Sequence, residues 1–456
     1  MKSKIRIASG QGFWGDLLEA PVNQVTKGEI DYLVMDYLAE VTMSILQKQK
    51  NRNPNLGYAR DLPDLMKRIL PICVEKKIKV ITNGGGVNPV HCADEILEHA
   101  VKLGVEKLMI AVVLGDDIHD RIDELIEAGA ELNNMETGES IKSVKHKILS
   151  ANVYFGAMPI VEALNHEADI VITGRTTDTG LTLAPMIYEF GWDPKDYDLM
   201  SAGTVAGHIL ECGAQSTGGN FLGDWMSIEN MAEIGFPIAE AYPNGEFVVT
   251  KHDNTGGKVS EETVAEQLLY EIGDPTDYIT PDCVADFTSI KLEDLGNNKV
   301  KVFNVKGKPD TEFYKVSCSY DDGFSTSGNL TYSWPQALSK AKAADKILRK
   351  RLENLNLKFD EIRSEFIGYN ATHESLAKKI DEDNINEIVL RVSVRSHDRK
   401  AITSFGKEIA PLILTGPPSV TGFAGGRPKP SDVVAYWPAL IKKDLVKPQV
   451  RILNLS

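Results

Sequence analysis

The sequence predicts an α/β protein with a mostly parallel N-terminal sheet flanked by helices, followed by a smaller α+β region of ferredoxin-like type. The first part rests on short apolar runs that alternate with helical periodicity through the first two hundred residues. The second part rests on the order strand–strand–helix–strand–strand–helix later in the chain. We therefore expect two domains, an α/β domain at 1–230 and an α+β domain at 231–456 with a proline- and glycine-rich tail.

The N-terminal elements follow from hydrophobic periodicity and from the residues that close each segment. Strands are expected near 4–9, 31–38, 76–86, 107–117 and 168–178. Helices are expected near 39–50, 91–104 and 118–130. The helix at 91–104, for example, has an amphipathic pattern that ends on Gly104. Apolar strands separated by helices are typical of a parallel sheet that is covered on both faces.

The C-terminal elements are shorter and more polar. A strand and a loop are expected at 246–257, and short antiparallel strands between 277 and 307. Residues 314–333 predict a hairpin, because Asp321, Asp322 and Gly323 are typical turn residues. A basic amphipathic helix at 334–355, a strand at 387–396 and a helix at 398–416 complete the α+β pattern, before the tail at 416–441.

Composition narrows the classes of function. The chain has 456 residues, of which 42% are hydrophobic and 25% charged, and its net charge is −15. These values are typical of a folded globular protein, and the negative charge disfavours nucleic acid and anionic membranes as partners. An anionic substrate would therefore need a local cluster of arginine, lysine or helix N-termini.

The cysteines and the apolar segments indicate a cytoplasmic protein. Five cysteines are scattered along the chain without a CxxC pair, which disfavours a disulfide framework and a structural zinc site. The N-terminus lacks the apolar stretch of a signal peptide, and no window approaches the ~18 apolar residues of a membrane span. We expect a cytoplasmic location.

Glycine and polar residues follow four successive predicted strands, in "GQGFWGD", "NGGGVNP", "GDD" and "TGRTTD". In open α/β sheets the ligand crevice lies at the carboxyl ends of the strands. Gly10, Gly12 and Gly15 also match a G-x-G-x-x-G fingerprint, with Asp36 as its acid, so a dinucleotide site is one hypothesis. The alternative is a tight turn plugged by Phe13 and Trp14.

Asp36 and Glu40 are the candidate metal ligands. They stand four residues apart, and two carboxylates at a strand end could hold a divalent metal or act as acid and base. The alternative is a helix cap and a solvated glutamate. Beyond this metal and the dinucleotide hypothesis, the cofactor is unknown from the sequence.

Two loops provide candidate substrate-binding groups. In "NGGGVNP" these are Asn83, Gly84, Gly85 and Asn88, where glycines can present backbone N–H groups and a helix begins after Pro89. A close-packed turn is the alternative. Asp116 and Asp117 in "GDD" are candidates for a metal or a ribose, or for a helix cap.

Arg175 follows the apolar strand "DIVIT" and is the candidate clamp for a carboxylate or phosphate, with Asp178 beside it. A buried ion pair between Arg175 and Asp178 is the alternative.

The segment "AGTVAGHILECGAQSTGGNF" at 202–221 places His208 and Cys212 four residues apart, on one face of a helix. Such a pair could supply a nucleophile or an acid and base, although both residue types are often simply buried. Gln215 and Asn220 are candidate pocket residues.

The loop "TKHDNTGG" at 250–257 provides a second acid–base candidate, His252, with Lys251 as a substrate-binding residue.

Six ordered blocks, together with the end "SHDRKAITSFGKEIAPLILTGPPSVTGFAGGRPKP", resemble the acyclic terpene utilisation protein A family over nearly the whole chain. The blocks are "GFWGD", "DYLVMDYLAEVTMS", "NGGGVNP", "DIVITGRTTD", "AGHILECGAQSTGGNF" and "TKHDNTGG". The resemblance implies a role in the catabolism of citronellol- and geraniol-type compounds, whose acyl-CoA intermediates are carboxylated, hydrated and cleaved. It therefore implies CoA as part of the substrate.

Three functions follow as hypotheses. The first is a hydro-lyase or C–C lyase that acts on a branched acyl-CoA or a related carboxylic acid, in a homo-oligomer. The second is a non-catalytic subunit that binds a metabolite or a second protein subunit. The third is a dinucleotide-dependent oxidoreductase, which depends on "GQGFWGD" alone.

Overall fold

The computed structural model describes residues 2–422 and 426–455, and its fold is α/β as the sequence predicts. The chain divides into two compact units. One comprises Met1–Ser319 with Tyr436–Ser456, and the other comprises Tyr320–Ala435. The boundary expected after residue 230 falls inside the first, larger unit, because the short strands that follow it pair with the large sheet.

The larger unit is built on a ten-stranded mixed sheet with the order β11-β12-β8-β7-β1-β2-β3-β6-β4-β19. Its parallel part consists of β1 (Ile5–Gln11), β2 (Tyr32–Met35), β3 (Lys79–Thr82), β6 (Ile170–Thr173) and β4 (Leu108–Leu114). Every residue of β2 and β6 is buried, as expected for parallel strands that are covered on both faces.

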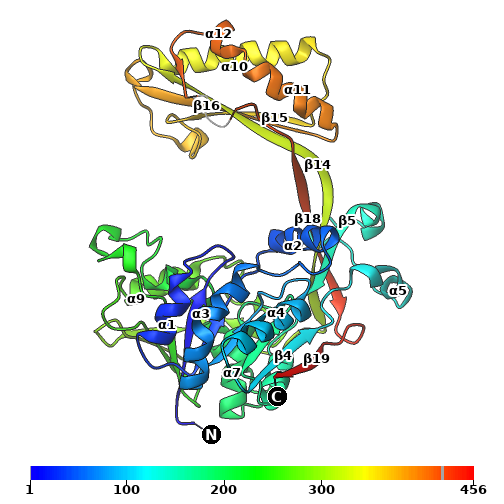
Figure 1. Ribbon diagram of the computed structural model, residues 1–456. Coiled ribbons are helices and arrows are strands. Elements are labelled where there is room, and N and C mark those ends of the chain that lie inside the picture. Colours follow the sequence, from blue (N-terminus) through cyan, green and yellow to red (C-terminus); the bar gives the residue numbers. More distant parts are fainter. Residues whose placement is uncertain (1, 423–425, 456) are drawn as a thin grey trace. The chain divides into compact units, whose positions relative to one another are not determined.

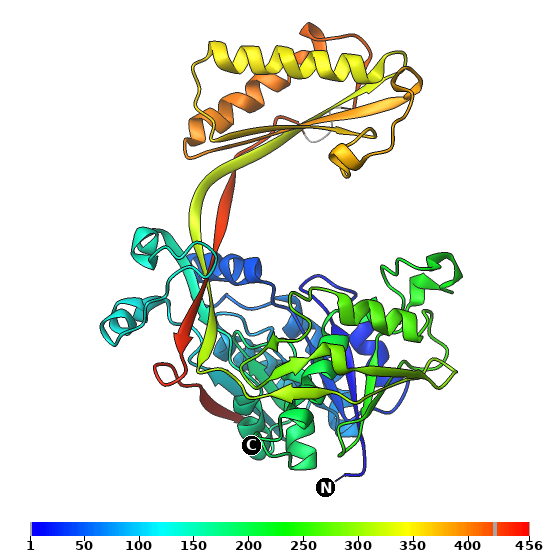
Figure 2. The same ribbon diagram turned by 180° about the vertical axis from the view of Figure 1, so that it is seen from behind.

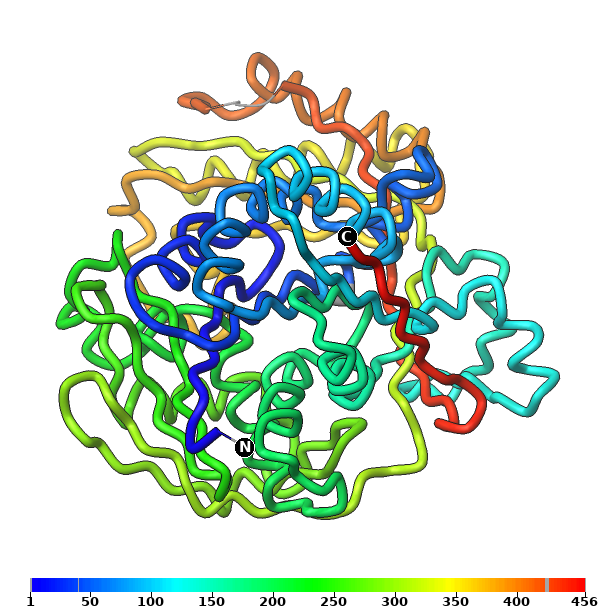
Figure 3. The backbone as a smooth tube through the Cα atoms, turned by 60° about the horizontal axis from the view of Figure 1, so that its bottom comes forward, coloured from blue at the N-terminus to red at the C-terminus, as the bar shows by residue number. Residues whose placement is uncertain are grey.

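Antiparallel strands extend both edges of this sheet. They are β7 (Ile238–Ala241), β8 (Phe247–Thr250), β12 (Val300–Phe303) and β11 (Lys291–Asp294) on one side, and β19 (Gln449–Leu455) on the other. The red C-terminal segment in Figure 3 therefore returns to lie beside β4.

Helices cover the two faces of the sheet. One face packs on α1 (Glu19–Thr26), α3 (Asp61–Lys76) and α4 (Pro89–Lys102), which Figure 1 shows together, and the other on α6 (Met158–Asn165), α7 (Gly180–Phe190) and α8 (Tyr197–Glu211). Successive side chains of a strand point to opposite faces, so Leu33 enters the first core and Val34 the second. The remaining helices of this unit are α2 (Glu40–Arg52), α5 (Ile122–Glu127) and α9 (Glu261–Leu269).

The strand order creates a topological switch point between β3 and β6. From β3 the chain passes through α4 to β4, on the far side of β6, whereas from β6 it turns back through α7 and α8 toward β7 and β1. Adjacent parallel strands whose connections leave in opposite directions open a crevice at their carboxyl ends. The residues that follow β3 and β6 are therefore placed at a ligand-binding position of this fold.

Shorter strands complete the larger unit. A three-stranded sheet has the order β13 (Lys306–Lys308), β10 (Val284–Asp286) and β9 (Tyr278–Ile279), and it is visible from behind in Figure 2. β5 (Ile148–Val153) pairs with β14 (Phe313–Ser333), whose residues belong to both units. No helix among the residues that the structure describes is long and apolar enough to cross a bilayer.

The smaller unit is a ferredoxin-like α+β sandwich. Its sheet has the order β15 (Glu361–Ile367), β16 (Glu387–Ser396), β14 and β17 (Val420–Thr421), and β18 (Ser431–Lys442) also pairs with β14. The helices α10 (Ala337–Asn354), α11 (Arg399–Ile409) and α12 (Leu412–Thr415) form its core with the alternating buried side chains of β16. The element order β-α-β-β-α-β matches the predicted type.

The predicted hairpin at 314–333 is wrong. These residues form the single strand β14, and Gly323 stays within it with a φ of +89°. Residues Phe324 to Ser333 pair continuously with β16, so the ladder of hydrogen bonds overrides the local turn preference of Asp321, Asp322 and Gly323.

Candidate functional site

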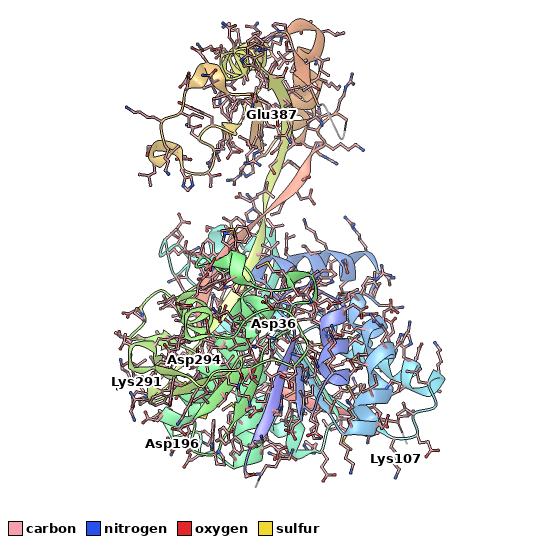
Figure 4. All side chains as sticks on the ribbon, turned by 90° about the vertical axis from the view of Figure 1, so that its left-hand side faces the viewer. Asp36, Lys107, Asp196, Lys291, Asp294 and Glu387 are labelled. Atoms are coloured by element: carbon pink, nitrogen blue, oxygen red, sulfur yellow. The ribbon has the colours of Figure 1, made fainter. Side chains whose placement is uncertain are left out.

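The carboxyl ends of the parallel strands bring several predicted site residues to one edge of the larger unit's sheet. Asp36 follows β2, Asn83 follows β3, Asp116 follows β4 and Arg175 follows β6. Figure 4 labels Asp36 among the strands of this unit, away from its margin. The predicted convergence of the strand-end loops is thus present in the fold.

Asp36 is a buried carboxyl group with a raised pKa. Its Oδ1 accepts hydrogen bonds from Asn83 Nδ2 at 2.7 Å and from the Leu38 backbone N–H at 3.0 Å. Burial raises the pKa of Asp36 well above its usual range, and the negative charge of Asp178 adds to this effect. Arg175 and the two hydrogen bonds oppose the shift without cancelling it. Asp36 therefore keeps its proton to higher pH than an exposed aspartate does.

Arg175 lies in a buried ion pair, the second of the two predicted alternatives. Its side chain is 2% exposed, and its Nη1 lies 3.2 Å from Oδ1 of Asp178. The guanidinium also donates to the Leu38 carbonyl and stacks over the Tyr154 ring at 4.2 Å from the centroid. Because these partners hold it, Arg175 fixes the position of the Asp178 carboxylate.

Asp178 is the accessible carboxylate of the group, with 33% of its side chain exposed. Its charge raises the pKa of three neighbours, which are Asp36, Glu211 and Tyr278. Asp178 therefore influences the protonation of these three groups and is itself in contact with solvent. We define Asp36, Asp178 and Glu211, with Arg175 and His208, as the carboxyl cluster.

His208 pairs with Glu211 on the same helix, α8. Its Nδ1 lies 3.0 Å from Glu211 Oε1, and its Nε2 donates to the Gln267 carbonyl at 3.0 Å. Gln267 returns a hydrogen bond of 2.9 Å to the His208 carbonyl. The ring is 1% exposed and makes edge contacts with Tyr278 and Phe287.

His208 and Glu211 shift each other's pKa. Burial lowers the pKa of His208, but the charge and contact of Glu211 raise it further, and the net shift is upward. Burial raises the pKa of Glu211, and His208 opposes that shift. Both ring nitrogens face oxygen atoms, so either the ring is an imidazolium or the Glu211 carboxyl carries the proton.

Cys212 does not pair with His208. It is the last, capping residue of α8, and among the described residues the His208 ring nitrogens face Glu211 and Gln267 instead. Burial, followed by the charge of Glu211, raises the pKa of the Cys212 thiol to about 12. Cys212 is therefore a neutral thiol near pH 7 and provides no thiolate nucleophile.

Sequence reasoning missed two residues of the site, Glu211 and Tyr278. Glu211 follows His208 by three residues on a largely apolar helix, and this spacing was a usable signal. Tyr278 comes from β9, far along the chain, and nothing local marks it. Burial, then the charges of Glu211 and Asp178, raise the pKa of Tyr278 well above its usual range, so its hydroxyl stays protonated.

The loop "NGGGVNP" is a close-packed turn, which corrects its prediction as a cradle for substrate. A Cβ on Gly85 would lie 2.6 Å from the Thr173 carbonyl oxygen, and one on Gly84 would lie 2.8 Å from Leu62. The N–H groups of Gly84, Gly86, Val87 and Asn88 all donate to protein oxygens. The Asn88 amide donates to the carbonyls of Pro54 and Leu56, at 2.9 and 2.8 Å. The Asn83 amide donates a hydrogen bond to Asp36.

Asp116 holds the loop after β6 in place by accepting a hydrogen bond from its backbone. Its Oδ2 accepts the Arg175 backbone N–H at 2.7 Å and Asn152 Nδ2 at 3.0 Å. A Cβ on Gly174 would lie 2.4 Å from this carboxyl group. Burial raises the pKa of Asp116 to about 7, against the effect of the Arg175 N–H. The other acid of this loop, Asp117, accepts the N–H of His119 at 3.1 Å.

The segment 202–221 forms a packed helix and turn. After α8, residues Gly213–Thr217 form a short 3-10 helix, and Gln215 there is half-buried. Asn220 is exposed, with a φ of +57°, so its side chain is a surface group rather than part of a buried pocket.

The G-x-G-x-x-G loop packs against the end of α8. A Cβ on Gly12 would lie 2.9 Å from the backbone of Cys212 and Gly213, and the Gly12 N–H donates to Asp16 Oδ2 at 2.9 Å. The close approach that a dinucleotide pyrophosphate requires is therefore taken by protein backbone.

Of the two predicted metal ligands, the structure describes the side chain of Asp36 alone. None of the described residues form a group of three or more histidine, cysteine, aspartate or glutamate side chains placed to hold an ion. Asp36 Oδ1 already accepts two N–H groups, and its neighbour Arg175 is cationic. Glu40 is the first residue of α2, and its side chain lies outside the described part of the chain.

Lys251 and His252, the second acid–base candidate and its neighbour, line a different hollow. His252 Nε2 donates to the Gln24 carbonyl at 3.0 Å, and Lys251 Nζ donates to the Thr255 carbonyl at 2.8 Å. Both residues line the hollow with Arg6. They follow β8, one of the antiparallel strands of the large sheet.

Comparison with known families gives one finding. The sequence model described as "Acyclic terpene utilisation family protein AtuA" matches residues 5–452, which include every residue of the carboxyl cluster. A search of curated proteins found no match.

Proposed function

Because the chain belongs to the acyclic terpene utilisation family AtuA, we propose that it is an enzyme of branched acyl-CoA or carboxylic acid catabolism. Its reaction is proposed to be the addition or removal of water, or the cleavage of a carbon–carbon bond. The observation that carries this proposal is the carboxyl cluster at the switch point, where acids with raised pKa values stand beside a solvent-facing carboxylate. Buried acids with raised pKa values beside another charged group are typical of acid–base sites.

The cluster supplies both proton transfers that hydration requires. The Asp178 carboxylate takes a proton from water, whose oxygen bonds to the β-carbon of an α,β-unsaturated thioester. The Glu211 carboxyl gives its proton to the α-carbon, so the carbon–carbon double bond becomes single. The reverse sequence eliminates water. The proton that Asp178 took from water returns to Glu211 through solvent, which closes the cycle. His208 is a positioning residue for Glu211, from which its Nδ1 lies 3.0 Å.

The pairing of Arg175 favours a thioester as the reacting group. Its guanidinium is already neutralised by Asp178, so little positive charge is left at the cluster to hold a free carboxylate. A thioester carbonyl is uncharged and avoids repulsion by the Asp178 carboxylate. The anionic character expected of the substrate would then reside in the CoA portion, away from the cluster.

A non-catalytic metabolite-binding subunit is the second candidate. It is favoured by the burial of Arg175 and His208, which are 2% and 1% exposed and have ordinary structural partners. Under this hypothesis the purified chain turns over no thioester, and it binds a second protein subunit from the native source in fixed proportion.

The proposed enzyme is tested on branched α,β-unsaturated acyl-CoA thioesters, by following the loss of their enoyl ultraviolet absorbance. We expect turnover by the native chain, and a decrease in kcat of about 100-fold or more for Asp178→Asn and Glu211→Gln. The matched controls are Asp94→Asn and Glu75→Gln, which change the same chemical groups on exposed parts of α4 and α3. An inert native chain, or equal losses in the controls, would contradict the proposal.

A further inference from the structure

A second polar hollow lies in the larger unit, apart from the carboxyl cluster. Its volume is about 460 Å³, which lies within the range of small-molecule sites. Four separate segments supply its cations: Arg6 from β1, Lys27 after α1, Lys251 after β8, and Lys299 before β12. In a chain with a net charge of −15, such a convergence of cations requires an explanation.

Three of the four cations of the hollow make no ion pair with a carboxylate among the described residues. Within residues 2–422 and 426–455, no ion pair involves the Nζ atoms of Lys27, Lys251 or Lys299. Lys251 is 8% exposed, and both of its hydrogen bonds go to one residue, Thr255. An ammonium has three N–H donors, so a buried lysine held only from one side retains donor capacity toward the hollow.

The acids of the lining do not cancel this charge. Glu240 is occupied by Arg6 at 2.9 Å and by Lys4 at 3.6 Å. Glu29 and Asp253 are exposed, as are Lys27 and Lys299, so solvent screens these four charges alike. Lys251 is the buried cation of the lining, and Arg6 is paired with Glu240. His252 packs directly on Gly28, where a Cβ would lie 2.3 Å from its Nδ1, so the ring forms a fixed wall.

We propose that this hollow binds the phosphate group of a small molecule. Lysine binds phosphate as a point charge, and a phosphate dianion uses several donors at once, as three lysines from separate segments can supply. A carboxylate, with a single charge, needs fewer partners. This proposal does not depend on the proposed reaction at the carboxyl cluster, and a failure of one leaves the other unaffected.

The test is isothermal titration of the full chain with inorganic phosphate, with pyrophosphate as a second probe. We expect saturable binding that weakens about tenfold or more in Lys251→Gln and Lys299→Gln, because each removes a charge-assisted hydrogen bond. The matched control is Lys258→Gln, an exposed lysine of the same region outside the hollow, which should bind like the native chain. Lys299 is also exposed, so its replacement keeps the test valid if the Lys251 variant fails to fold.

Histidine NMR gives a second readout, since a bound anion should move the titration of His252 to higher pH. Burial, opposed by its bond to Gln24 and aided by Arg6 and Lys76, lowers the pKa of His252 in the free protein. The proposal is overturned if the native chain shows no saturable binding, if Lys258→Gln weakens binding as much as the hollow variants, or if phosphate leaves the His252 titration unchanged.

Discussion

The aspartates at the strand ends differ in role: one acts on the protonation of its neighbours, and another holds a loop in place. Their burial and their partners distinguish the two roles. Asp178 faces solvent and acts on three neighbouring groups, whereas Asp116 is enclosed and holds one loop in place. Both are aspartates in polar loops, and the sequence gives them the same appearance. The tertiary partners separate the chemical candidate from the structural one.

The buried carboxyl of Asp116 makes stability depend on pH. Its folded pKa, about 7, lies above the ordinary value of about 4, so the native state binds the extra proton between these values. This stabilisation is fully present below pH 4 and is lost as the pH rises toward 7. In Asp116→Asn we expect the fall in unfolding free energy between pH 5 and pH 7 to shrink by on the order of 2–3 kcal/mol.

Urea unfolding at the two pH values measures the effect of Asp116→Asn. Asparagine can keep an oxygen acceptor for the Arg175 N–H and the Asn152 amide. Asp94→Asn, on the exposed face of α4, serves as the control and should follow the native pH dependence. An unchanged pH dependence in Asp116→Asn would show that the carboxyl does not take up a proton in this range.

At the scale of elements, the turn between β3 and α4 is defined by close packing. Replacing Gly85 with alanine would place a Cβ 2.6 Å from the Thr173 carbonyl oxygen and 2.5 Å from Pro89. We expect Gly85→Ala to lower the free energy of unfolding by about 1–3 kcal/mol, because the loop and β6 must separate. Urea midpoints provide the measurement.

Gly273→Ala is the control for this turn, since a Cβ there meets nothing within 4 Å. Its stability should stay close to that of the native chain. If both alanine variants were equally stable, the loop would have room for a side chain, and a role in presenting backbone to a ligand would regain support.

Elements with strong local signals were predictable, and those fixed by long-range pairing were not. The buried strands and the helix at α4 follow from periodicity and end residues. β14 is a single strand despite its turn residues, because ten successive residues pair with β16. Pairing partners that lie more than fifty residues away leave no local mark in the sequence.

At the scale of the whole molecule, each unit has its own hydrophobic core. The larger unit contains the cores on the two faces of its sheet, and the smaller unit contains a third, formed by β14, β15, β16 and their helices. Separate cores favour separate unfolding transitions. We expect Leu390→Ala, in the third core, to destabilise the smaller unit by about 2–5 kcal/mol.

Differential scanning calorimetry of the full chain tests this expectation. In Leu390→Ala one transition should move to lower temperature, and the transition of the larger unit should keep its Tm. A single transition that shifts as a whole would mean that the two units unfold together.

The sequence by itself determined the fold class, the alternation of strands and helices, the polar loops at the strand ends and the kinship with the family. Only the tertiary structure decided that Arg175 pairs with Asp178, that His208 pairs with Glu211 rather than Cys212, and that Lys251 and His252 line a separate hollow. The physical reason is range. Periodicity and turn chemistry act between residues close in sequence, whereas the partner and burial of a side chain depend on strands brought together from distant parts of the chain.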